Sequence, residues 1–233
     1  MSWNQASSVP ADVRDARVTA FLSKVYGWMF LGLLVTSGTA LIVASSPVLI
    51  KTLILNRFLF WILLFAPIGL VWYMAARVEQ MAPTTAAGMF LLYSGLVGIT
   101  TSVIFLVYTS SSIVSSFVIT AGMFGAMAVF GTFTKRSLAG WGQFLFMGLI
   151  GLIIAMVVSI FWLNDLLAFV ISVVGVIVFT GLTAYDAQRL KEMAVALPDG
   201  RVGSYAVVGA LSLYLDFINL FFFILRLFGG RRN

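Results

Sequence analysis

The residue best suited to chemistry is a lone carboxylate inside an apolar stretch near the end of the chain. Of the 24 positions between Arg201 and Arg226, only Asp216 is charged, and a run of that length can cross a bilayer as a helix. A charge near the middle of such a helix costs at least about 2.5 kcal/mol and usually faces a protein interior or a water-filled cavity. Asp216 is therefore a candidate functional residue.

Small and polar residues line one side of the same stretch. Gly209, Ser212, Asp216, Asn219 and Arg226 recur at helical spacing, which places them on one face of the helix. Because lipid would tolerate that face poorly, we expect this helix to lie inside a bundle, with the other helices packed around its polar face. Ser212 and Asn219 would then support the carboxylate.

Two more charged residues directly follow other apolar runs of the chain. Asp186 follows the run at residues 166–185, and Arg77 follows the run at residues 58–76. Two carboxylates that face each other in a low-dielectric site cannot both ionise cheaply. Such a pair would share one proton and act as a pH sensor. A docked arginine would favour the doubly charged pair, so Arg77 is a candidate gating partner. The carboxylates could also line a cation path or bind calcium through their oxygens.

The depths of the two carboxylates differ if each helix is confined to its span. At about 1.5 Å per residue, Asp216 lies near the bilayer midplane and Asp186 about 15 Å from it. Either the seventh helix starts deeper or the sixth extends inward, and the spacing leaves both alternatives open.

The composition is that of an integral membrane protein. The 233 residues are 61% hydrophobic and 9% charged, against roughly 25% charged for a soluble domain. The apolar runs do not alternate with period two, which favours a helical bundle over a barrel. With no cysteine and no histidine, thiolate chemistry and the commonest transition-metal ligand are excluded, and no cofactor is expected. The basic residues lie between apolar runs, so the net charge of +6 indicates topology and no nucleic-acid partner.

Charged residues and turn signals divide the chain into one seven-helix domain, residues 25–229, after an N-terminal cytoplasmic tail, residues 1–24. The predicted spans are 25–44, 58–76, 86–107, 113–133, 144–163, 166–185 and 206–228.

The basic residues predict the orientation of the bundle. With the N-terminus inside, nine lie on the inner side: Arg14, Arg17, Lys24, Arg77, Lys135, Arg136, Arg189, Lys191 and Arg201. The other side holds five: Lys51, Arg57, Arg226, Arg231 and Arg232. The excess favours a cytoplasmic N-terminus and a C-terminus on the opposite side.

Four segments of the chain resemble a known family. GLTAYDAQRLK at Gly181–Lys191 and GALSLYLDFINLFFFILRLFG at Gly209–Gly229 look like signature segments of the Bax inhibitor-1 (transmembrane Bax inhibitor motif) family. TAGMFGAMAVFG at Thr120–Gly131 and KVYGWMFLGLL at Lys24–Leu34 look like its bacterial branch.

This resemblance implies a seven-helix fold whose last helix is wrapped by the other six. It also implies a pH-sensitive calcium leak through the inner membrane of a bacterium. The proton would be shared by Asp186 and Asp216, and Arg77 would help to hold the closed state. Calcium would be the permeant ion, and the bilayer the surrounding partner.

Other function classes compete with the channel. A membrane stress-response regulator would bind and modulate other membrane proteins, such as a membrane protease. An intramembrane aspartyl protease would need a GxGD pattern, whereas Tyr214 and Leu215 precede Asp216. We therefore expect no enzyme. An organic-substrate transporter is disfavoured because the spans hold few polar groups.

Overall fold

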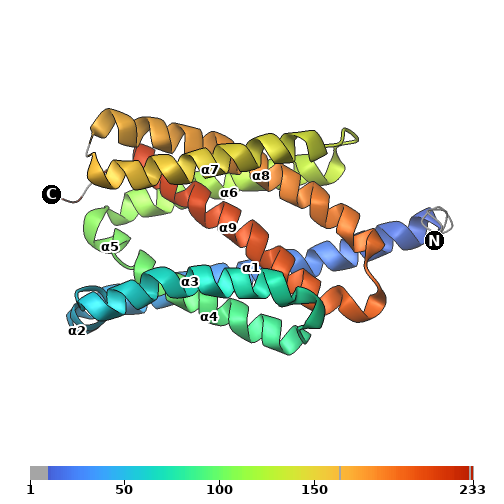
Figure 1. Cartoon of the computed structure of the whole chain (residues 1–233), viewed down its shortest axis with the longest axis horizontal. Coiled ribbons are helices and arrows are strands. Elements are labelled where there is room, and N and C mark those ends of the chain that lie inside the picture. The colour runs from blue at the N-terminus through green and yellow to red at the C-terminus, as the bar shows by residue number, and fades with distance from the viewer. Residues whose placement is uncertain (1–9, 163, 231, 233) are drawn as a thin grey trace. The chain divides into compact units, whose positions relative to one another are not determined.

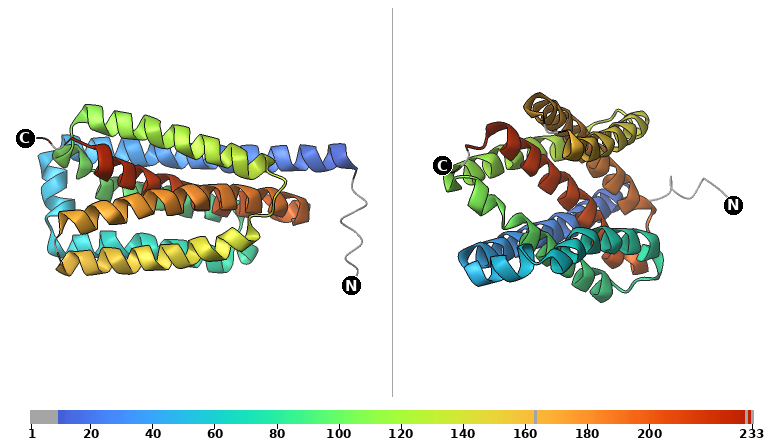
Figure 2. Two further views of the ribbon diagram at one scale, coloured as in Figure 1. Left: turned by 90° about the horizontal axis from the view of Figure 1, so that it is seen from above. Right: turned by 60° about the vertical axis from the view of Figure 1, so that its left-hand side comes forward.

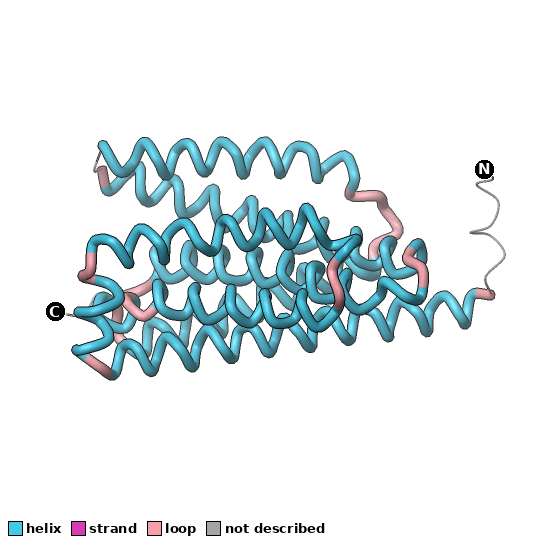
Figure 3. The backbone as a smooth tube through the Cα atoms, turned by 60° about the horizontal axis from the view of Figure 1, so that its bottom comes forward, coloured by secondary structure: helices cyan, strands magenta, loops and turns pink. Residues whose placement is uncertain are grey.

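The computed structural model describes residues 10–162, 164–230 and 232, which are helical apart from short connections and contain no strand. Figure 1 labels the helices, and Figure 3 shows how short the loops between them are. Seven described segments are long and apolar enough to cross a membrane. The predicted all-helical membrane architecture is therefore confirmed. The helices are α1 (Ala11–Ser45), α2 (Pro47–Leu49), α3 (Arg57–Arg77), α4 (Pro83–Thr101), α5 (Ile104–Val107), α6 (Ser110–Phe133), α7 (Ala139–Phe161), α8 (Asp165–Ala196) and α9 (Val202–Phe228), with short turns η1 (Ile50–Ile54), η2 (Val78–Gln80) and η3 (Asp199–Arg201).

The chain forms two compact units, and each is described by itself. Unit 1 comprises Met1–Val103 and Leu190–Tyr214, and unit 2 comprises Ile104–Arg189 and Leu215–Asn233. Helices α8 and α9 each pass from one unit to the other. The expectation that α9 is wrapped by the other six helices stays a prediction.

Helix ends follow local capping signals. Asn56 accepts hydrogen bonds from the backbone N–H groups of Phe58 and Leu59 at the start of α3, and Thr109 accepts one from Ser112 at the start of α6. Pro83 occupies the first turn of α4, where its missing N–H has no helical partner to lose. These signals fix where the apolar runs become separate helices.

The third predicted span, residues 86–107, is not one continuous helix. Helix α4 ends at Thr101, and α5 begins at Ile104. The hydroxyls of Thr100, Thr101 and Ser102 donate to backbone carbonyls three residues earlier, at 2.9, 3.1 and 2.7 Å. Such local bonds compete with the regular helical ladder, which explains the break.

The N-terminal tail and several span limits also differ from the helices. Helix α1 begins at Ala11, so the described part of the predicted tail, residues 1–24, is mainly helical, while residues 1–9 lie outside the described residues. Leu163, the predicted end of the fifth span, also lies outside them; α7 ends at Phe161. Helix α9 begins four residues before the predicted start at residue 206.

The core of unit 1 holds a buried polar network on the first half of α9. Thr36 of α1 donates to the backbone carbonyl of Ser94 at 3.0 Å, and its oxygen lies 2.6 Å from the Tyr214 hydroxyl. Because Thr36 has one proton to donate, Tyr214 is the donor of the second bond. The Phe90 and Tyr93 rings meet the Tyr214 ring edge-on, with centroids 5.6 and 5.7 Å away. This network fixes the rotation of α9 two residues before Asp216.

Candidate functional site

Asp216 lies in the part of α9 that belongs to unit 2, and its side chain is only 5% exposed. Among the described residues, its Oδ2 atom has no hydrogen-bond partner. A buried carboxylate oxygen without a partner carries a desolvation cost that packing does not offset. Asp216 therefore lies in the interior of unit 2, and its role as a functional residue stays a prediction.

Asp186 lies in the interior of α8, because this helix continues to Ala196, beyond the predicted span 166–185. The residues after Asp186, AQRLKEMAVA, are mostly good helix formers, and Pro198 is the first residue that disfavours a helix. Of the two alternatives for the depth of the carboxylates, extension of the sixth helix is the one found.

The longer helices bring the carboxylates to similar depth. Asp186 lies ten residues before Ala196, the end of α8, and Asp216 fourteen residues after Val202, the start of α9. At about 1.5 Å per residue, they lie about 15 and 21 Å from the short connection, a difference of about 6 Å. Both residues belong to unit 2.

Close contacts with α6 and α7 position the turn of α8 that carries Asp186. A Cβ atom at Gly131 of α6 would meet the backbone of Ala184, with the Ala184 carbonyl carbon at 2.8 Å and its Cα at 2.9 Å. A Cβ atom at Gly142 of α7 would meet the Tyr185 ring. Both glycines thus let α8 lie directly against its neighbours just before Asp186. The left view of Figure 2 shows α8 between α6 and α7.

A buried amide holds the next residues of α8. The Gln188 side chain is 7% exposed; its Nε2 donates to the Arg136 carbonyl at 2.9 Å, and its Oε1 accepts from the Leu138 N–H at 2.7 Å. These two bonds fasten the connection between α6 and α7 to α8. Gln188 therefore fixes both the helix position and the loop beside Asp186.

Replacing Gln188 by alanine should lower the stability of unit 2, because the Arg136 carbonyl and the Leu138 N–H would each lose a partner. Leaving such groups unpaired costs about 1–3 kcal/mol, so the unfolding midpoint of the purified protein in detergent should fall. The matched control is Gln143→Ala on α7, where the side chain is exposed. Equal midpoints for the two variants would contradict the role given to Gln188.

The remaining predicted site residues divide between the units. Asn219 lies in unit 2, where its Nδ2 donates to the Leu215 carbonyl at 2.8 Å. Ser212 and Arg77 lie in unit 1, and the Arg77 guanidinium donates to the Gln80 side chain at 2.8 Å. The gating contact expected of Arg77 therefore stays a prediction.

The site offers few ligands to a metal ion. Within the described residues, no group of three carboxylates could hold one. Calcium takes six to eight oxygen ligands, so Asp186 and Asp216 alone would leave most of its coordination to water and backbone.

Sequence reasoning missed Gln188 and Gly131 as residues that position the site. Gln188 lies within the GLTAYDAQRLK segment and Gly131 ends the TAGMFGAMAVFG segment. A polar amide two residues after a candidate carboxylate was the available signal for Gln188. For Gly131, glycine spacing indicates helix packing without identifying the partner helix.

Comparison with known proteins finds similarity over almost the whole chain. Residues 18–233 match the model of a family described as Inhibitor of apoptosis-promoting Bax1. The chain is 45% identical over 221 residues to the inner membrane protein YbhL of Escherichia coli strain K12, covering 93% of this chain and 94% of YbhL. It is 40% identical over 220 residues to RP147 of Rickettsia prowazekii, covering 94% and 93%. It is 37% identical over 225 residues to YrjE of Lactococcus lactis, covering 96% of each. The matched region includes every residue of the candidate site.

Proposed function

Because this chain belongs to the Bax inhibitor-1 family of membrane proteins, we propose that it forms a calcium leak path controlled by a proton shared between Asp186 and Asp216. The observation that carries the proposal is the buried Asp216 carboxylate, whose Oδ2 atom has no hydrogen-bond partner among the described residues, in the same unit as Asp186. Two such carboxylates repel each other when both are ionised, and a shared proton relieves the repulsion.

The charge of the pair then depends on pH. As pH falls, the pair takes up the shared proton and loses one negative charge. As pH rises, it releases the proton, and the second carboxylate attracts a cation more strongly. Arg77 is the proposed gating partner, since a guanidinium close to the pair would favour its doubly ionised state.

The proposed location is a bacterial inner membrane with a cytoplasmic N-terminus. The name of YbhL as an inner membrane protein supports the membrane, and the nine-to-five division of basic residues supports the orientation. In that orientation the connection between α6 and α7 faces the cytoplasm, and the end of α9 faces the other side.

The test is calcium flux into dye-loaded liposomes that contain only the purified chain, scanned from pH 6 to 8. We expect calcium entry above that of empty liposomes, with a rate that depends on pH. If the protein passes no more calcium than empty liposomes at any pH, the leak path is wrong. The alternative, a regulator that binds and modulates other membrane proteins, would then take its place.

A further inference from the structure

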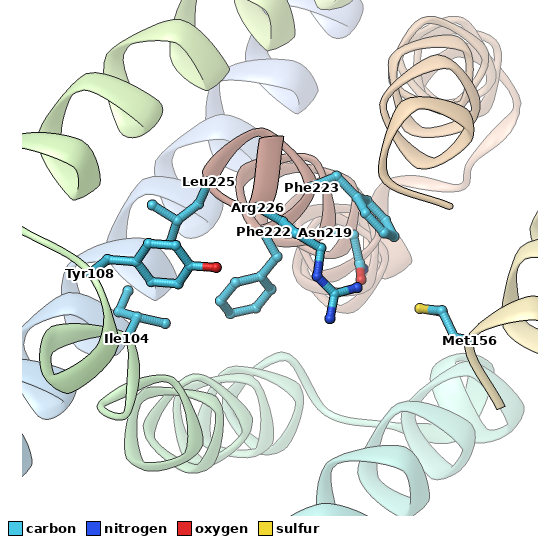
Figure 4. A pocket seen from close by; sticks show the side chains of 8 residues that line it. All are labelled: Ile104, Tyr108, Met156, Asn219, Phe222, Phe223, Leu225 and Arg226. Carbon is cyan, nitrogen blue, oxygen red and sulfur yellow. The ribbon is translucent and has the colours of Figure 1, made fainter. Parts of the chain in front are cut away.

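A cleft of about 290 Å³ lies beside the last turns of α9 in unit 2 (Figure 4). Its walls come from α5, α7 and α9, and most of its lining is carbon. The apolar lining residues are Ile104, Met156, Phe222, Phe223 and Leu225, and the polar ones are Tyr108, Asn219 and Arg226. Within the membrane-spanning bundle, this cleft therefore combines an apolar wall with a cation.

The cation in this cleft has no partner within the part of the chain that the structure describes. The exposed Arg226 guanidinium makes no hydrogen bond or ion pair there, and the Tyr108 hydroxyl makes none either. Both side chains extend toward the same space, on either side of Phe222 (Figure 4). A guanidinium carries five N–H donors in a planar fork, so the cleft presents several unused donors to one region.

The donors are held in place by the chain on both sides of the cleft. The Thr109 N–H donates to the Gly230 carbonyl at 3.2 Å, and the Arg232 N–H donates to the Val107 carbonyl at 2.9 Å. The Gly230 N–H donates to the Ser112 hydroxyl at 2.9 Å. These bonds tie the turn that follows α5 to the segment that follows α9. Tyr108 and Arg226 are therefore kept at the same end of unit 2.

The depth of the cleft matches the polar and apolar layers of a lipid. Arg226 lies two residues before Phe228, the end of α9, and Asn219 nine residues before it. These separations are about 3 and 14 Å along the helix. The guanidinium is thus near the membrane surface, where phosphate groups lie, and the apolar wall continues inward, where acyl chains lie.

We propose that this cleft binds one anionic phospholipid, with its phosphate on the Arg226 guanidinium and the Tyr108 hydroxyl and its acyl chain against Phe222 and Met156. Arginine matches phosphate oxygens through two parallel N–H bonds. A free phosphate ion could use the same donors, but it would gain nothing from the apolar wall. The lipid is therefore the occupant that uses both halves of the cleft. This inference is independent of the aspartate pair.

The experiment measures lipid retention by the full-length protein, purified in detergent and supplied with phosphatidylglycerol or phosphatidylcholine, by native mass spectrometry. Wild type should retain phosphatidylglycerol about tenfold more strongly than phosphatidylcholine. Arg226→Gln should lose about tenfold of that retention, since charged hydrogen bonds are removed, and Tyr108→Phe should lose less. Arg57→Gln is the matched control, because it removes an exposed arginine from the same predicted side that does not line the cleft.

Three outcomes would overturn the lipid site. Wild type could retain the two lipids equally, or Arg57→Gln could lower retention as much as Arg226→Gln does. Inorganic phosphate at millimolar concentration could also displace phosphatidylglycerol completely, which would assign the donors to a free anion. Helical content and the unfolding midpoint of each variant are measured together with lipid retention. Arg226→Lys keeps the charge without the planar fork, so its retention of phosphatidylglycerol should be intermediate.

Discussion

Asparagine in place of Asp216 is expected to abolish the pH dependence of calcium flux through the reconstituted protein. Asparagine has nearly the same shape as aspartate but binds no proton in this range, so Asp186 would have no partner with which to share one. For a single shared proton, the ratio of the doubly ionised pair to the singly protonated pair changes by up to about tenfold per pH unit. The flux of wild type should follow that ratio between pH 6 and 8, whereas the flux of Asp216→Asn should stay flat.

The same measurement on two further variants makes the prediction specific. Asp186→Asn removes the other member of the pair and should flatten the profile in the same way. Asp165→Asn removes an exposed carboxylate in the first turn of α8, the helix that carries Asp186. This control should keep the profile of wild type. If Asp216→Asn also keeps it while it conducts calcium, the pair does not sense pH.

The sequence was sufficient for the class of fold because the bilayer penalises charges strongly. Runs of 19 or more positions with at most one charge predict spanning helices without any knowledge of their packing. The turn signals at Ser45–Pro47 and Tyr108–Ser112 then separate neighbouring helices. Helix α8 shows the limit of this reasoning, since hydropathy indicates where a helix leaves the apolar layer and not where its backbone hydrogen bonds stop.

The candidate site was predictable only in part. Asp216 could be found because an ionisable group in an apolar run is costly wherever the other helices lie. The similar distance of Asp186 and Asp216 from the connection between α8 and α9 depends on the extension of α8 to Ala196, so spacing alone left it open. Gln188 and Gly131 act through tertiary contacts with α6, α7 and their connection, and a single sequence does not identify such contacts.

Alanine at Gly131 is expected to destabilise the protein, although alanine normally favours a helix over glycine by about 0.5–1 kcal/mol. The new Cβ atom would meet the Ala184 backbone, which includes a carbonyl carbon at 2.8 Å. Backbone cannot rotate away as a side chain can, so α6 and α8 must separate. Overpacking of this kind typically costs about 1–3 kcal/mol, and it would also move the turn that carries Asp186.

Gly125 of α6 provides the matched control for this effect, because a Cβ atom there would meet nothing within 4 Å. Gly125→Ala should raise the unfolding midpoint in detergent slightly, whereas Gly131→Ala should lower it. Opposite signs for the same substitution on one helix separate the contact with α8 from helix propensity. If the two variants shift the midpoint alike, the close approach of α6 to α8 does not contribute to stability. The pH profile of calcium flux is measured on the same two variants. If Gly131→Ala flattens it and Gly125→Ala preserves it, the close approach of α6 to α8 keeps Asp186 near enough to Asp216 to share a proton.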